Sequence, residues 1–129
     1  MRPINQDDKG WIIFKTKSLY GERMPDVEGC QRWFDANWNN PQVIMLRTDE
    51  SFAVGTLGNV FFDPAIKGTI HFFGGQIWEL SKIFKEWIRI AKERGCTELY
   101  FTASTGYNIA PLAKRIGASL YYPTYWKEL

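Results

Sequence analysis

Hydrophobic and polar positions follow two different rhythms along this chain. Between residues 80 and 91 the apolar residues recur every three or four positions, with charged residues between them. This spacing is typical of a helix with one buried face, and Gly95 is placed to end that helix. The apolar stripe consists of Leu80, Ile83, Phe84, Trp87, Ile88 and Ala91.

Residues 42 to 75 have a different pattern, which favours strands. Four segments are rich in β-branched and aromatic residues, and turn residues such as Gly, Asn, Asp and Pro separate them. The short separations predict an antiparallel meander. The four segments are 43–47, 52–57, 60–62 and 69–73.

Two helices are expected ahead of these strands. Asp7 or Asp8 can cap a helix that runs to about Tyr20, although the apolar run at 11–14 is also compatible with a strand. A second helix is expected from about residue 25 to residue 38, where apolar residues recur at roughly helical spacing.

The chain beyond the long helix continues as strand, short helix and strand. The strand at 97–102 alternates branched and aromatic residues. Asn108 is placed to cap the short helix and Gly117 to end it, and a last strand follows at 119–126. The strand at 69–73, the long helix and the strand at 97–102, in that order, predict a parallel pair joined by a right-handed crossover.

Composition narrows the class of protein. At 129 residues, 45% hydrophobic and 23% charged, the chain predicts a single folded domain spanning residues 1–129. A net charge of +2 gives no electrostatic case for nucleic acid or for an anionic membrane. No signal peptide and no membrane-spanning run is expected, so a cytoplasmic setting is the prediction.

Few side chains point to metal or redox chemistry. Cys30 and Cys96 are far apart and lack CxxC spacing, so reduced thiols are expected, with one disulfide left open. The chain has a single histidine, His71, and no Cys/His cluster, so a zinc site has no support. One local feature does point to a ligand, because Gly74 and Gly75 end a strand just before the long helix. Phosphates commonly bind at such helix starts.

The order helix, helix, antiparallel meander, helix, strand, helix, strand resembles the GNAT (Gcn5-related N-acetyltransferase) fold. The resemblance is strongest over residues 69–129. There, AKERG at 91–95 is similar to the family's common helix end, and IGA at 116–118 is similar to its LGF sequence. With GGQIWELS before the long helix, the wider pattern most resembles small GNAT-like proteins of tailed bacteriophages.

The resemblance implies a single α/β (α+β) domain with a mixed central sheet, an antiparallel N-terminal meander and flanking helices. It also implies that acetyl-CoA lies in a cleft between two splayed parallel strands, where an amine attacks the thioester. Carried over by position, the strand backbone would pair with the pantetheine arm and the next helix start would hold the pyrophosphate. The cofactor-binding residues implied in this way are Phe72, Phe73, Gly74, Gly75, Gln76, Ser81, Lys82 and Asn108.

The sequence departs from the family pattern at two motifs. The small residues of the phosphate loop R/Q-x-x-G-x-G/A fall on Trp78 and Leu80, so Gly74 and Gly75 would have to replace them. The family's tyrosine, which protonates the leaving sulfur, falls on Ala113. The nearest phenol, Tyr107, is the candidate acid in its place.

Each candidate also has a structural interpretation. His71 is the candidate general base, because its ordinary pKa suits proton transfer near neutrality, but it could equally be a structural strand residue. Gly74 and Gly75 could simply form a bulge or turn, and Asn108 could simply cap a helix. Tyr107 could be a surface aromatic residue.

Two hypotheses of different class follow. The first is an N-acyltransferase that moves acetyl from acetyl-CoA to an unidentified amine, with degenerate motifs. The alternative is a catalytically silent GNAT-fold phage accessory or virion-assembly protein that acts through a protein partner or a second copy of itself. In that case it would work in the host cytoplasm.

Overall fold

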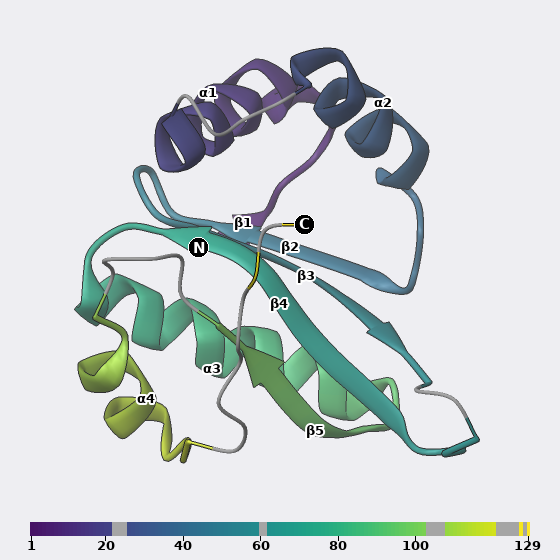
Figure 1. Cartoon of the computed structure of the whole chain (residues 1–129), viewed down its shortest axis with the longest axis vertical. Helices are drawn as coiled ribbons and strands as arrows, with labels where there is room; N and C mark the ends of the chain where they lie inside the picture. Colours follow the sequence, from purple (N-terminus) through teal and green to yellow (C-terminus); the bar gives the residue numbers. More distant parts are fainter. Residues whose placement is uncertain (22–25, 60–61, 103–107, 121–126, 128) are drawn as a thin grey trace.

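The computed structural model describes residues 1–21, 26–59, 62–102, 108–120, 127 and 129. One five-stranded sheet has the order β1-β2-β3-β4-β5, with α1 and α2 on one face and α3 and α4 on the other (Figure 1). The strands are β1 (Arg2–Pro3), β2 (Val43–Arg47), β3 (Phe52–Gly58), β4 (Ile66–Gly74) and β5 (Cys96–Phe101). The helices are α1 (Lys9–Tyr20), α2 (Val27–Asn37), α3 (Ile77–Glu93) and α4 (Ala110–Ile116).

This order confirms the predicted fold class. β2, β3 and β4 form the antiparallel meander, and β4 and β5 are parallel across α3. The run at 11–14 is helical rather than extended, because a capping box at Asn5 and Asp8 starts a helical turn just before it. Gly95 and Gly117 follow the ends of α3 and α4 with φ of +88° and +73°, the left-handed region expected there.

Two strand predictions differ from the structure. The segment 60–62 was predicted as a strand, but Phe62 lies in a turn, and residues 60–61 lie outside the described residues. This segment belongs to a loop that a side chain holds together, because Asn59 Nδ2 donates to the Pro64 carbonyl at 2.7 Å. In the last predicted strand, 119–120 are not extended into a sheet, and 121–126 lie outside the described residues. The two-residue β1 was not predicted, because it is too short to show a period.

The sheet buries one apolar layer on each face. On the α3 face, Trp87 is fully buried and its indole nitrogen donates to the Ile44 carbonyl at 3.0 Å. Gly55 and Gly68 make room for this ring, because a Cβ on either would lie 2.6 or 2.8 Å from its atoms. On the other face, Phe34 of α2 stacks at 5.4 Å from Trp38. These two layers therefore show which strand side chains point toward α3 and which point toward α1 and α2.

None of the helices in the described ranges is long and apolar enough to cross a membrane. Cys30 lies in α2 and Cys96 begins β5, and both are free thiols. The predicted reduced state of the two thiols stays a prediction.

Candidate functional site

β4 and β5 stop pairing before β4 ends. Their parallel pairing runs from Ile66 opposite Cys96 to Ile70 opposite Phe101. β4 then continues to Gly74, and α3 begins at Ile77. The end of a central strand and the start of a long helix therefore lie together beside the point where the parallel pair ends.

His71 occupies a bulge in β4, next to this point. Val54 of β3 lies opposite Phe72, but the next residue of β3, Gly55, lies opposite Ile70. His71 is thus the extra residue on β4. Such bulges re-aim side chains and are common beside active sites.

The His71 ring lies on the sheet face that carries α1 and α2. Gly55 faces Trp87 and α3, so the next strand residue, Thr56, faces the opposite side. His71 Nε2 lies 2.8 Å from Thr56 Oγ1 on that side. The residue remains exposed, yet partial burial of the ring lowers the pKa of His71. Its imidazole is therefore neutral at pH 7 and competent to accept a proton.

Phe72 and Phe73 differ from His71, because their side chains belong to the two apolar layers. Phe72 packs against Phe34 at 6.1 Å between ring centres, and Phe73 packs against Phe84 at 5.1 Å. Only the backbone of these two residues is suitable for contact with a ligand.

Gly74 and Gly75 are glycines because neighbouring side chains press on them. A Cβ on Gly74 would lie 3.0 Å from the Phe52 ring. Gly75 has φ of +130°, and a Cβ there would overlap the Ser51 side chain and come within 2.9 Å of its Cα. The tight packing of this turn explains why both residues are glycines without any ligand. The interpretation of Gly74 and Gly75 as a tight turn therefore holds whether or not a ligand binds there.

The start of α3 presents backbone amides in its first turn and a lysine in its second. Its N-cap, Gln76, makes no side-chain cap bond, and its Oε1 accepts from the Trp78 indole. The first amides of a helix have no partner within it and favour anions. Lys82 Nζ lies 5.4 Å from the centre of the exposed Trp78 ring. Ser81 is buried, and its hydroxyl donates to the Trp78 carbonyl at 2.9 Å.

The first turn of α3 also carries a carboxylate, that of Glu79, which two hydroxyl groups hold by hydrogen bonds. Glu79 Oε2 accepts from Ser51 Oγ at 2.5 Å and from Thr48 Oγ1 at 2.6 Å. These two bonds, that from Ser51 first, lower the pKa of Glu79. The negative charge is therefore held against the turn between β2 and β3. A cavity of about 400 Å³ borders it, lined in part by Lys15, Glu50, Gly75 and Gln76.

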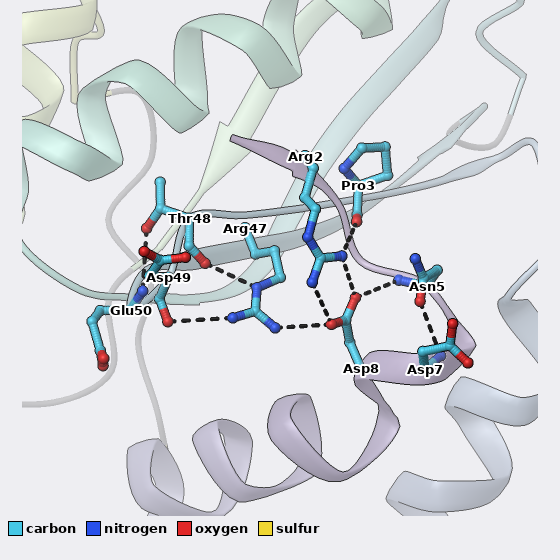
Figure 2. A network of polar contacts seen from close by, with 9 residues as sticks. All are labelled: Arg2, Pro3, Asn5, Asp7, Asp8, Arg47, Thr48, Asp49 and Glu50. Atoms are coloured by element: carbon cyan, nitrogen blue, oxygen red, sulfur yellow. Dashed lines mark hydrogen bonds and ion pairs between the residues drawn. The ribbon is translucent and has the colours of Figure 1, made fainter.

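An ionic network around the buried carboxylate of Asp8 holds that turn in place (Figure 2). The Arg2 guanidinium donates twice to Asp8, each at 2.7 Å, and Arg47 donates to Asp8 at 2.9 Å. Arg47 also lies 3.5 Å from the centre of the Trp11 ring and donates to the Asp49 carbonyl at 3.3 Å. The network joins the N-terminal segment, α1 and the β2–β3 turn.

Sequence reasoning missed this network. It treated Asp7 or Asp8 as a helix cap. Asp8 does occupy the N-cap position of α1, but its side chain makes no cap bond there. The side chain that caps the preceding turn is that of Asn5, which accepts from the Asp7 amide at 2.9 Å. Nothing in the spacing of Arg2, Asp8 and Arg47 signals that they meet. The capping sequence was the one available sign that this segment turns back.

The remaining candidates are Asn108, which lies just before α4, and Tyr107. Asn108 Oδ1 accepts from the Ala110 amide at 3.1 Å, but the N-cap of α4 is Ile109, so Asn108 lies one residue ahead of the cap position predicted for it. Tyr107 lies outside the described residues. Among the residues that the structure describes, no group of three or more His, Cys, Asp or Glu side chains could hold a metal ion.

No protein-family model and no curated protein sequence matches the chain. Solved structures do match. One is AAC(6′)-Iy in complex with the bisubstrate analogue CoA-S-monomethyl-acetylneamine, with a TM-score of 0.76 and 12% identity. That match covers 99% of this chain and 95% of the other.

Two further structures are similar over the same extent. An aminoglycoside acetyltransferase from an uncultured soil metagenomic sample, in complex with sisomicin, has a TM-score of 0.67 and 13% identity and covers 99% of this chain and 94% of its own. The ribosomal-protein-alanine N-acetyltransferase of Brucella melitensis biovar Abortus 2308 has a TM-score of 0.68 and 13% identity, with coverage of 99% and 98%. The chain has the GNAT fold. These matches do not support a narrower likeness to phage proteins.

Proposed function

We propose that this chain is an N-acyltransferase that transfers an acetyl group from acetyl-CoA to an amine. The observation that carries the proposal is the extension of β4 past its last pair with β5, directly before the start of α3, within this fold. AAC(6′)-Iy, which has the same fold, holds a bisubstrate analogue that contains CoA. In this chain, acetyl-CoA would supply the activated thioester.

The residues present fit the cofactor in part. The backbone from Phe72 to Gly74 would align with its pantetheine arm, and the turn at Gly75 and Gln76 would lead its pyrophosphate to the first amides of α3. Lys82, exposed one turn into the helix, would add a positive charge. Glu79 opposes the phosphates, but its hydroxyl partners Thr48 and Ser51 hold it aside.

Other residues contribute less than the sequence implied. The Ser81 hydroxyl is committed within the helix, so its contribution would be limited to its position in the backbone. Asn108 would act by starting α4. Trp78, half exposed, stands where the family pattern has a small residue, and its ring offers a surface on which an adenine could stack.

Two side chains would move protons. His71 would take a proton from the acceptor amine, because its lowered pKa leaves it neutral at pH 7. Tyr107 is proposed to return a proton to the leaving sulfur. Positioned groups of this kind typically contribute about 100- to 10,000-fold to the rate.

Isothermal titration of the stripped protein with acetyl-CoA tests the proposal. We expect micromolar binding, weakened several-fold by Lys82→Ala. Lys85→Ala is the matched control, because it removes an exposed lysine three residues further along the same helix, and it should bind like the wild type. A folded protein that gives no heat up to millimolar acetyl-CoA would refute the proposal.

A panel of amines then tests turnover. It should include aminoglycosides and a peptide with an N-terminal alanine, because these amines are named for proteins of the same fold. Release of free CoA thiol, dependent on the amine and reduced by His71→Gln and Tyr107→Phe, is the expected result. Turnover unchanged in either variant would remove that residue from the mechanism.

A further inference from the structure

Polar side chains line the open sheet face beside His71. Thr56 of β3 lies directly opposite Thr69 of β4, and Thr69 lies opposite Tyr100 of β5. Residues directly opposite one another project to the same face of a sheet. This row of hydroxyl groups therefore crosses three strands next to the bulge, on the face toward which His71 projects.

The charged groups of this face are paired with one another. On β5, the Tyr100 hydroxyl donates to Glu98. On β4, Lys67 Nζ lies 3.6 Å from Glu98 and 3.1 Å from Asp63. Among the described residues, the hydrogen bond that the His71 ring makes is the one to Thr56.

An imidazole that serves as a base must present one nitrogen to the substrate, with the other nitrogen held. In the neutral ring one nitrogen carries a proton and the other accepts. With Nε2 directed at Thr56 Oγ1, the nitrogen that remains for a substrate is Nδ1.

We propose that Thr56 is the positioning residue for His71, holding it with Nε2 protonated so that Nδ1 faces the acceptor amine. This inference rests on the proposed function. The proton balance is simple. An N–H bond of the substrate ammonium breaks, a proton joins Nδ1, and the amine keeps its electron pair for attack. The Nε2–H group donates to Thr56 Oγ1 both before and after this transfer.

The same contact stabilises the protonated ring. A hydroxyl oxygen that accepts from an imidazolium makes a charge-assisted bond, which is stronger than the bond to the neutral ring. Loss of Thr56 Oγ1 should therefore free the tautomer and lower the measured pKa of His71 further.

The single histidine makes the test direct. Nitrogen-15 NMR of protein labelled at histidine reports the tautomer and the pKa of this one ring in the intact chain. We expect the Nε2–H form to dominate in the wild type. Thr56→Val should give mixed tautomers and a lower pKa, and Thr56→Ser should restore both.

Thr69→Val is the matched control, because it removes the neighbouring hydroxyl from the same row, and it should leave the spectrum unchanged. In the amine assay, Thr56→Val should lower kcat about tenfold with little change in KM, because the base loses orientation rather than substrate contacts. The pH below which the Thr56→Val enzyme loses activity should fall together with the His71 pKa.

The outcomes separate the two proposals. If Thr56→Val leaves the tautomer and pKa of His71 as in the wild type, the positioning role is overturned, whatever the activity. If the spectrum changes while kcat does not, the role in the reaction is overturned. Failure of the proposed function appears separately, as a wild-type protein that binds no acetyl-CoA while the spectral contrast between Thr56→Val and Thr56→Ser persists.

Discussion

Replacing Asp8 with asparagine removes a buried negative charge and almost no volume. The Asp8 carboxylate accepts two bonds from Arg2, one from Arg47 and one at 3.0 Å from the Asn5 amide. Asparagine keeps one acceptor, but it directs an NH₂ group at guanidinium donors. The substitution should therefore destabilise the fold through charge rather than through packing.

The size of the loss follows from the burial of the two arginines. Arg47 is only 12% exposed and would be left without its carboxylate, a situation that typically costs about 3–5 kcal/mol. Arg2 is half exposed and can return to water, which reduces the loss. We expect Asp8→Asn to lower the free energy of unfolding by about 2–4 kcal/mol. Such a loss is large against the roughly 5–15 kcal/mol of an ordinary domain.

Urea unfolding at pH 7, followed by tryptophan fluorescence, measures this loss. If the free energy of unfolding falls by about 2 kcal/mol for each molar of urea, the urea concentration at the unfolding midpoint should fall by about 1–2 M. Asp35→Asn is the matched control, since Asp35 bonds to Lys9 at 2.8 Å but is 50% exposed. Its midpoint should not move measurably, because surface ion pairs contribute little.

Acid provides a second readout of the same contact. Hydrogen bonds from Arg2, then the Asn5 amide and the charge of Arg47, hold the pKa of Asp8 well below its ordinary range. Stabilisation by a group with a lowered pKa is complete above its unfolded pKa of about 3.9 and is lost as the pH falls below it. The gap between wild type and Asp8→Asn should be constant from pH 7 to pH 5 and shrink below about pH 4. A gap under about 0.5 kcal/mol at pH 7, or one that does not shrink in acid, would refute the reasoning.

Two further variants test the turn at α3. Gly75→Ala should lower the free energy of unfolding by about 2–4 kcal/mol, because it places a Cβ on Ser51 at a φ of +130°. Gly10→Ala should raise it by about 0.5 kcal/mol in the same denaturation assay, since a Cβ at that helical position meets nothing within 4 Å; equal effects of the two would contradict this account. Glu79→Gln should bind acetyl-CoA several-fold more tightly by titration, because a negative charge leaves the helix start that is proposed to hold phosphates. Weaker binding would show that Glu79 is no obstacle there.

The helices were predictable because their signal is local. The stripe from Leu80 to Ala91 depends on neighbours three and four residues apart, and α3 buries all of that stripe except Ile88, which is half-buried. The glycines at 95 and 117 were predictable for the same reason, since a helix end requires a left-handed residue close by.

The candidate site was predictable only in outline. The parallel neighbours β4 and β5 follow from the strand–helix–strand order, and the structure confirms them. The bulge that changes the direction of the His71 side chain depends on the register between β3 and β4, and no local sequence pattern predicts that register. The contact of His71 with Thr56 joins residues fifteen positions apart and appears only once that register is set.

The pair Gly74 and Gly75 shows why a motif alone can mislead. A glycine pair before a helix is equally typical of a phosphate site and of a tight turn. Only the structure shows Phe52 and Ser51 pressed against it. The prediction of phosphate binding there therefore awaits the titration.

By itself, the sequence determined the order of the main elements, the single-domain α/β class and the helix ends, because these depend on short-range periodicity and on backbone preferences. Tertiary structure alone decided which polar groups meet. Arg2 and Arg47 both bond to the buried carboxylate of Asp8, although 39 positions separate Asp8 from Arg47. A buried charge is stable only where the fold brings it a partner, and that partner is chosen by the packing of the whole chain.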